Sequence, residues 1–287
     1  MYIGHDRHVV LSDLELIKKA FQNPIFQGRP RVEIFEFDGV SHGITLTTGQ
    51  EWQDQRRFTL RHLRDFGFGK NSMEGLVLEE VDELLGWLKS QGNNPVCLNT
   101  KFNLAVVNSL WRIITGSRFS QSDPKLQGIF DKLFTATHPN SSFHSSMGDI
   151  SLSALALDLF QAGSLTTSTT LAWAVLYLIL HLDVQKKLQK EIDDVIGQSR
   201  QSYMADKPRM TYTEALTCEV LRKSSLLPFG AFHAATEDTS FEGYDMPKGT
   251  LIRADPSKPM PSMNEPVPVF GLLEAPEFFV TLKSRRD

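Results

Sequence analysis

The chain has 287 residues, with 30 lysines and arginines against 34 aspartates and glutamates, which gives a formal net charge of −4. Charged residues make up 22% and apolar residues 41%, an ordinary globular composition that excludes wholesale disorder. The mildly acidic balance, without a long basic run, argues against nucleic acid as a partner. Two cysteines, Cys97 and Cys218, are too few for a disulfide framework and suit a reducing compartment.

Membrane insertion and secretion have little support in the sequence. The longest unbroken apolar run, Leu171–Leu180, is shorter than the roughly 20 residues that span a bilayer. The first seven residues include Asp6 and Arg7, and no apolar stretch of signal-peptide length follows them. We therefore expect a chain that does not insert into a membrane by itself.

In chain order, the first half predicts one short strand followed by helices. His8–Leu11 is β-branched and strand-like, and Ser12-Asp13 can cap a helix that continues to Phe21 and ends at Asn23-Pro24. Repeated glycines predict a loop with one short helix between residues 26 and 49. Apolar spacing then predicts helices over residues 51–64, 72–90 and 103–115.

The second half predicts one long central helix, a further helix and a few strands. Ile150–Ile196 is helical in pattern, apolar on every side from Leu171 to Leu182 and amphipathic beyond, although the glycine and hydroxyl residues of Ala162–Thr170 make a poor helix interior. A helix at Tyr212–Arg222 follows, and strands are expected at residues 239–244, 249–253 and 277–283. Residues 137–148 read as a loop, and the prolines between 254 and 268 exclude regular structure.

The motifs are individually weak, and each has an ordinary alternative. Trp52 and Arg56 share a helical face, where the guanidinium could hold a buried carboxylate or simply stack on the indole at the surface. Glu219 and Arg222 form an i, i+3 pair of the kind common on surfaces. The Gly163–Thr167 break could bind a small ligand and relay protons, or could serve only helix packing.

Together and in this order, these segments resemble the cytochrome P450 superfamily of haem-thiolate monooxygenases, in its microsomal, clan 2-like animal branch. The matching segments are Phe26–Pro30 (FxGRP), Gly49–Phe58 and Leu63–Gly69 (helix C block), Ala162–Ser168 (AGSxTTS of helix I), and Glu219-x-x-Arg222 with Pro228, His233, Thr236, Asp238 and Gly243–Thr250 (helix K and the strands after it). Several long blocks in register are specific, although any one motif alone would not be.

The resemblance implies a mainly α fold, an incomplete cytochrome P450 fold with a small β region, in one truncated domain over residues 1–287 (parts 1–136, 149–198, 211–253 and 266–285). It implies a role for each matching residue. The haem propionates would be held by Arg29, Trp52, Arg56 and His233. Thr166 would help deliver protons to dioxygen, Glu219 and Arg222 would be a structural pair tying helix K to the haem-side core, and no protein residue is assigned as a metal ligand.

The family's activity is monooxygenation of a lipophilic substrate (steroid, terpenoid, fatty acid or xenobiotic). It uses haem (heme, an iron porphyrin) and electrons from NADPH through a partner flavoprotein, NADPH–cytochrome P450 reductase. By family the location is the cytosolic face of the endoplasmic reticulum membrane. We expect that this chain lacks the N-terminal anchor and could be cytoplasmic.

The sequence departs from the family at the iron ligand and over the substrate pocket. The haem-binding loop FxxGxRxCxG is absent, no cysteine follows Cys218, and neither cysteine stands at the ligand position. Cys97 is expected in a loop, Cys218 inside helix K, and both as buried structural residues. Leu165 replaces the acidic residue before Thr166, and most of helices F and G is missing.

Because oxygen activation in this family needs a thiolate on iron, we expect the activity to be lost. The chain then reads as a truncated, internally spliced or exon-skipped product. Two alternatives stay open: a non-catalytic decoy that binds the reductase through the basic helix C face (Arg56, Arg57, Arg61, Arg64), or an unstable fragment.

Overall fold

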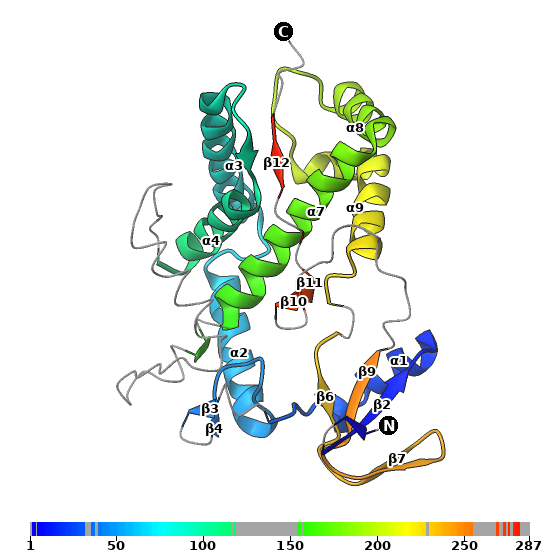
Figure 1. Ribbon diagram of the computed structural model, residues 1–287. Helices are drawn as coiled ribbons and strands as arrows, with labels where there is room; N and C mark the ends of the chain where they lie inside the picture. Colours follow the sequence, from blue (N-terminus) through cyan, green and yellow to red (C-terminus); the bar gives the residue numbers. More distant parts are fainter. Residues whose placement is uncertain are drawn as a thin grey trace. The chain divides into compact units, whose positions relative to one another are not determined.

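The computed structural model describes residues 2–3, 5–31, 36–37, 40–115, 118, 154–155, 158–227, 230–254, 268–269, 272–273, 275 and 278–281. The chain divides into two compact units, and each is described by itself. The first comprises residues 1–62, 124–161 and 227–259; the second comprises residues 63–123, 162–226 and 260–287. Helices predominate and the sheets are small (Figure 1), which confirms the expected mainly α class. The expected single domain and its parts stay a prediction.

The first unit is organised around a four-stranded sheet in the order β1 (Tyr2–Ile3), β2 (Asp6–Leu11), β9 (Leu251–Ala254) and β6 (His233–Ala234). Strand β2 runs parallel to β9, with His8 opposite Leu251, and β6 pairs antiparallel with β9. Helix α1 (Leu14–Gln22) begins where expected, because Asp13 accepts the backbone N–H groups of Glu15 and Leu16, in the first turn of the helix, at 3.0 Å each. Its buried face joins Leu11, Phe26 and Ile252 in one apolar core.

One expected strand of the first unit is a hairpin instead. Residues 239–244 do not form a single strand: β7 (Thr239–Phe241) turns back antiparallel onto β8 (Tyr244–Met246). The two residues at the turn, Glu242 and Gly243, have φ of 52° and 81°. Two successive left-handed residues match the twist of a tight hairpin, and glutamate in the first of these positions hid the turn from sequence reasoning.

The segment between residues 26 and 49 is mostly loop, as expected. It holds the short helix η1 (Pro24–Gln27) and the two-residue strands β3 (Glu36–Phe37) and β4 (Val40–Ser41). Helix α2 (Gly49–Asp65) follows and covers the expected range.

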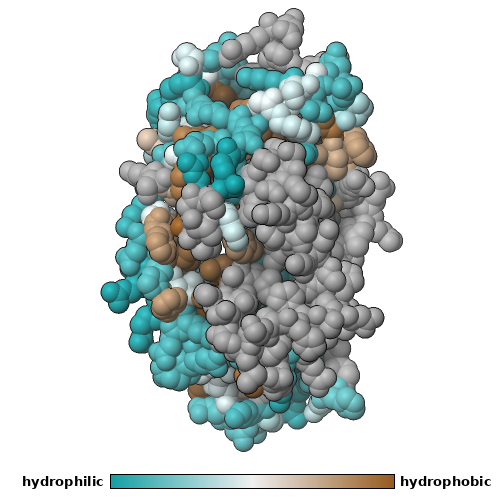
Figure 2. All heavy atoms as spheres, turned by 90° about the vertical axis from the view of Figure 1, so that its left-hand side faces the viewer, coloured by the Kyte–Doolittle hydropathy of each residue, from teal (hydrophilic) through white to brown (hydrophobic). Residues whose placement is uncertain are grey.

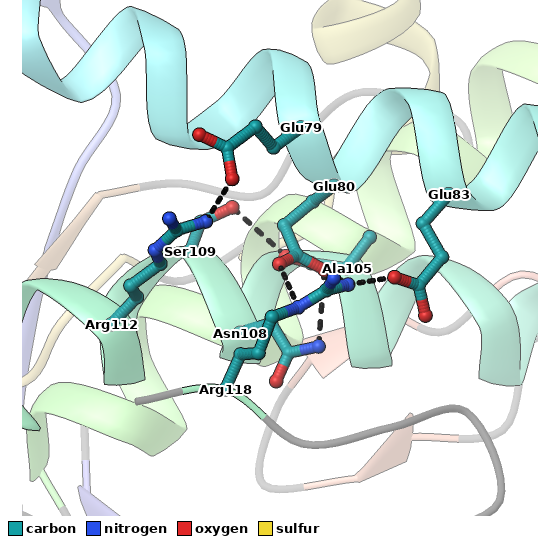
Figure 3. A network of polar contacts seen from close by, with 8 residues as sticks. All are labelled: Glu79, Glu80, Glu83, Ala105, Asn108, Ser109, Arg112 and Arg118. Atoms are coloured by element: carbon teal, nitrogen blue, oxygen red, sulfur yellow. Dashed lines mark hydrogen bonds and ion pairs between the residues drawn. The ribbon is translucent and has the colours of Figure 1, made fainter. Parts of the chain in front are cut away.

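The second unit contains α3 (Asn71–Gln91) packed against α4 (Asn99–Thr115), with a buried polar network between them (Figure 3). Glu80 of α3 is only 2% exposed. Its carboxylate accepts the Asn108 amide at 3.0 Å and pairs with the Arg118 guanidinium at 3.1 Å. Arg118 also pairs with Glu83, and Arg112 pairs with the more exposed Glu79. Buried charge is tolerated here because each carboxylate meets a donor.

The expected long central helix is divided into two helices of different character. The π-helical turn η3 (Gln161–Leu165) leads into α7 (Thr166–Leu180), and α8 (Leu182–Val195) begins after His181, whose φ of −123° and ψ of 76° are not helical. The break falls where the all-round apolar pattern gives way to the amphipathic one, and Asp183 in the first turn of α8 favours a new helix start.

Helix α9 (Thr211–Ser224) lies against α7 and α8, and a side chain from α8 completes its first turn. The Glu191 carboxylate accepts the backbone N–H groups of Tyr212 and Thr213 at 2.7 and 2.8 Å. Before α9, the short helix η4 (Met204–Arg209) is stabilised by Asp206, whose carboxylate accepts hydrogen bonds from Arg200 and Arg209. The hydrogen bond from Arg200 is the main reason why the pKa of Asp206 lies far below its usual range.

Short strands complete the second unit. Strand β12 (Phe279–Val280) lies within the expected last strand and pairs with β5 (Val96–Cys97), while β10 (Pro268–Val269) pairs with β11 (Leu272–Leu273). Cys97 is thus in a strand rather than in the expected loop. The expected loop at residues 137–148, Pro228, and the proline-rich residues 255–267 lie outside the described residues.

The apolar central segment and the surface both bear on membrane contact. By length and composition the helical segment Asp158–Leu180 could cross a membrane, although its apolar run is short. Of its apolar 18-residue window, 44% is buried, which a core helix also shows. Figure 2 shows one face, where hydrophilic side chains in teal cover most of the described surface and hydrophobic ones in brown gather in patches. Val77, Val81 and Leu85 form a partly exposed stripe along α3.

Candidate functional site

Arg29 and His233 are brought together in the first unit by a close backbone contact. The Gly28 carbonyl accepts the Ala234 N–H at 2.8 Å, and a Cβ at Gly28 would lie only 2.6 Å from the Ala234 oxygen. Only glycine allows this approach, which explains the glycine of FxGRP. The Arg29 Nη1 then lies 3.3 Å from His233 Nδ1. Two of the four expected propionate-binding residues are therefore neighbours.

Both side chains are partly buried and lack an acidic partner within the described residues. Arg29 donates to the carbonyls of Thr45 (3.1 Å) and Gly28 (3.4 Å), and burial lowers the pKa of its guanidinium. The His233 ring stacks on Phe21 with centroids 4.6 Å apart, and its Nδ1 lies 2.7 Å from the Phe26 oxygen. Burial first, and then the neighbouring Arg29, lower the pKa of His233. The Arg29 guanidinium is partly buried without an acidic partner among the described residues, and such a charge favours a negatively charged ligand.

The other two expected members, Trp52 and Arg56, lie on α2 and contact each other. The Arg56 guanidinium carbon is 5.6 Å from the centre of the Trp52 ring, and Arg56 is exposed. This is the surface stacking that the sequence left open as the ordinary alternative. Within the described residues no polar contact joins this pair to Arg29 or His233, and the role of the four residues in holding propionates stays a prediction.

Asp158, a residue that sequence reasoning missed, anchors the loop that carries Thr45. Its Oδ2 accepts the backbone N–H groups of Ile44 and Thr45 at 2.6 and 2.9 Å. Gly43 allows this contact, because a Cβ there would lie 2.2 Å from Oδ2 and its φ is +83°. Burial raises the pKa of Asp158 even though two N–H groups stabilise the charge. We call this contact of Asp158 with Ile44 and Thr45 the Asp158 clamp. Since the Thr45 carbonyl accepts from Arg29, the clamp also helps to position Arg29.

In the second unit, the helix break expected around Thr166 is present, and Gly163 within it lies against Leu110. The break is the π-helical turn, where the Thr166 hydroxyl donates back to the Ala162 carbonyl at 2.6 Å and that of Ser168 to the Ser164 carbonyl at 2.7 Å. A Cβ at Gly163 would lie 2.7 Å from Leu110 Cδ1. Close approach to α4 therefore accounts for the glycine, and the proton-delivery role of Thr166 stays a prediction.

The Glu219–Arg222 pair is formed but is not buried. Its two N–O contacts are 2.6 and 2.5 Å, and its side chains are 46% and 51% exposed. The Tyr177 hydroxyl, on the neighbouring α7, is buried and makes no hydrogen bond within the described residues. Burial raises the pKa of this hydroxyl, while Arg222 lowers it and Glu219 raises it. The described residues show no contact by which the pair would tie α9 to a haem-side core.

Neither cysteine has the expected buried structural setting. Cys97 is half-buried in β5, and Cys218 is exposed on α9, one residue before Glu219. Neither forms a disulfide. The described residues contain no cluster of three histidine, cysteine or acidic side chains that could hold a metal ion.

A family profile named Cytochrome P450 matches residues 1–147 and 126–257. A solved zebrafish cytochrome P450, determined with progesterone, superposes with a TM-score of 0.75 at 24% identity, over 89% of this chain and 74% of that one. The fold and the profile together define a member of the cytochrome P450 family, and this chain belongs to it.

Curated relatives place it beside the microsomal type. Human cytochrome P450 2J2 is 31% identical over 323 residues, and mouse cytochrome P450 2D10 is 32% identical over 325 residues. These matches cover 87% and 88% of this chain but only 64% of each relative. An alignment of 323 positions exceeds the 287 residues of the chain, so the human protein carries residues that this chain skips between matched blocks.

The residues present fit the carboxylates of haem but do not match the family's ligand for its iron. Arg29 offers a partly buried positive charge with His233 beside it, which suits a propionate carboxylate. The iron of this family needs a cysteine thiolate, and the only two cysteines, Cys97 and Cys218, lie in β5 and α9 rather than in the family's ligand loop. The side chains thus match the haem carboxylates but supply no match for its iron ligand.

Proposed function

We propose that this chain is a cytochrome P450 family member that does not perform the family's monooxygenation. The observation that carries the proposal is the pair of cysteines, neither of which stands in the ligand loop. Thiolate donation drives cleavage of the O–O bond, and a haem without it cannot follow the family's chemistry. Leu165, in place of a carboxylic acid beside Thr166, is consistent with the same loss.

The proposal is tested by the spectrum of the reconstituted protein. The full chain is mixed with haem, reduced and exposed to carbon monoxide. We expect no Soret band of a thiolate-ligated complex, and turnover with NADPH and reductase no higher than without the chain. A thiolate-type band that disappears in Cys97→Ser or Cys218→Ser would overturn the proposal and identify the ligand.

A second candidate function is binding of the flavoprotein reductase without catalysis. Helix α2 corresponds to the helix C block, and its Arg57, Arg61 and Arg64 are exposed. Arg57 has only a loose contact with Asp54 at 3.8 Å, and Arg61 and Arg64 pair with no acid within the described residues. An unneutralised basic face favours an acidic partner.

A pull-down with the reductase tests this candidate. Arg57→Glu plus Arg61→Glu should abolish retention, and higher salt should weaken it for the unaltered chain. The matched control, Lys186→Glu plus Lys187→Glu, makes the same charge change on exposed positions of α8 and should leave retention unchanged. Equal retention of the α2 and α8 variants would discard reductase binding through α2.

The family also implies a substrate class, cofactors and a location. A lipophilic substrate, haem, NADPH-derived electrons and the endoplasmic reticulum are what the family implies. Of these, we retain for this chain only haem recognition through carboxylates and contact with the reductase. Fractionation of cells expressing the chain, with and without alkaline washing, would distinguish a membrane-integrated protein from a peripheral or cytoplasmic one.

A further inference from the structure

Two segments of the chain carry a pair of basic residues three and two places before a hydroxyl side chain. They are Arg56-Arg57-Phe58-Thr59 and Arg222-Lys223-Ser224-Ser225. Protein kinases distinguish substrates partly by such charge patterns, because an acidic groove beside the kinase active site attracts the basic residues. The two segments are alike in sequence, and the structure distinguishes them.

Thr59 is closed to modification in the folded chain. It lies in the interior of α2 and is only 4% exposed. Its hydroxyl donates to the Gln55 carbonyl, one turn earlier, at 2.7 Å. A kinase would have to unwind the middle of α2 to reach this hydroxyl, and because helix formation is cooperative the turns on both sides oppose that opening.

Ser225 lies just past the end of α9, where the chain leaves the helix. Its backbone is left-handed, with φ and ψ of 43° each, a conformation that is costly for residues other than glycine. Its N–H donates to the Leu221 carbonyl at 3.3 Å, and its hydroxyl donates to the Arg222 carbonyl at 3.2 Å in an exposed position. Ser224, one residue earlier, is only 1% exposed. The accessible hydroxyl of this segment is therefore that of Ser225, and a helix end opens more easily than a helix interior.

Arg222 offers a phosphate at this position a partner. Its guanidinium pairs with Glu219, three residues before it, and both side chains are about half exposed. Ser225 lies three residues after Arg222, on the other side of it in the sequence. A phosphate carries close to two negative charges and three acceptor oxygens, so it would compete with the single charge of Glu219 for this guanidinium. Its charge would also lie near the last carbonyls of α9, which are partly negative, and would weaken the final turn.

We propose that Ser225 is a phosphorylation site for a serine/threonine protein kinase that prefers basic substrates, and that its modification opens the last turn of α9 and draws Arg222 away from Glu219. The Ser225 Oγ attacks the γ-phosphorus of ATP, and a new O–P bond forms while the bond from that phosphorus to the β–γ bridging oxygen breaks. ADP leaves with the electron pair of the broken bond, and the hydroxyl proton passes to a carboxylate base of the kinase. The inference is independent of the proposed loss of monooxygenation, because it concerns only contacts within the second unit.

Phosphorylation of the full chain tests the site. The chain is incubated with ATP and the catalytic subunit of cyclic-AMP-dependent protein kinase, and fragmentation mass spectrometry separates Ser224 from Ser225. We expect phosphate on Ser225 and at least about tenfold less on Ser224 or Thr59, whose burial opposes access. Phosphate mainly on Thr59 or Ser224, or no incorporation at all, would overturn the proposal.

Variants identify the acceptor and the recognition element. Ser225→Gly removes the hydroxyl and suits the left-handed backbone, so it should keep the fold and lose the incorporation. Lys223→Gln leaves the Glu219–Arg222 pair intact and should slow incorporation about fivefold or more. The matched control, Lys186→Gln, alters an exposed lysine of α8 and should change nothing. Incorporation by Ser225→Gly or by Lys223→Gln equal to that of the unaltered chain would refute the assignment.

Hydrogen exchange and NMR test the consequence for α9. The Ser225 amide should exchange about fivefold faster in the phosphorylated chain, the equivalent of one lost backbone hydrogen bond, while the amides of Tyr212 and Thr213 at the other end stay unchanged. The Arg222 Nε–H, which donates to Glu219, should change its chemical shift on kinase treatment in the unaltered chain but not in Ser225→Gly. Unchanged exchange at Ser225 would overturn the opening of the last turn, and an unchanged Arg222 resonance would overturn the exchange of partners.

Discussion

Replacing Asp158 with alanine should open the loop formed by residues 43–47. The substitution removes the acceptor of two backbone N–H groups, those of Ile44 and Thr45. At about 1 kcal/mol net for each hydrogen bond, the loss is about 2 kcal/mol, or about 30-fold in the opening equilibrium. Hydrogen exchange at these two amides should accelerate by that factor, while exchange in the β2–β9 ladder stays slow.

The matched control is Asp13→Ala in the same unit, since Asp13 also accepts two N–H groups. It should accelerate exchange at Glu15 and Leu16 and leave Ile44 and Thr45 unchanged. Asp158→Asn should cost less than alanine, because the amide keeps an oxygen acceptor and removes a charge that burial disfavours. Unchanged exchange of Ile44 and Thr45 in Asp158→Ala would refute the clamp and its link to Arg29.

Three further outcomes are expected. Gly43→Ala should destabilise the first unit by at least about 1 kcal/mol in urea unfolding, since its φ of +83° and the Asp158 carboxylate both oppose a side chain. Gly49→Ala is the control: its φ of +73° is also strained but no atom lies near its Cβ, so it reports the cost of backbone strain without a steric clash. Glu80→Ala should cost about 2–3 kcal/mol, because it removes the buried carboxylate that accepts from the Asn108 amide and pairs with Arg118. Glu79→Ala, at an exposed pair, should cost under about 1 kcal/mol. Burial lowers the folded pKa of His8 and His233 below 6.5, so the folded state binds fewer protons than the unfolded state. The stability of the first unit should therefore fall between pH 7 and 5.5, and His8→Gln should lessen that fall. A flat stability profile in the unaltered chain would contradict this prediction.

Local patterns in the sequence predicted most of the helices. Asp13 before an apolar period gave the start of α1, and the spacing of leucines gave α3, because these signals lie within a few residues of what they determine. The division at His181 was missed because its sequence carries no proline or glycine. The hairpin at Glu242 was missed because glutamate rarely adopts a left-handed conformation.

The candidate site was predictable only in part. The pairing of Arg29 with His233 was anticipated through the resemblance, since no periodicity connects residues 204 positions apart. Asp158 escaped notice because its partners lie 114 and 113 positions away, and a single aspartate before an apolar helix carries no signal of them. Gly43 was the available clue, since a glycine that cannot be replaced marks a close approach.

The carboxylate of Glu191 gives α9 a beginning that its own sequence does not encode. Met210, at the position where a capping side chain is expected, offers no oxygen to the first N–H groups, and Glu191 on α8 supplies one for Tyr212 and Thr213. A peptide comprising α9 alone would therefore fray at its amino end, and docking of α8 and winding of α9 become one cooperative event. The helix that carries Glu219 and Arg222 thus depends on Glu191, 21 residues before Tyr212, for the hydrogen bonds of its first turn.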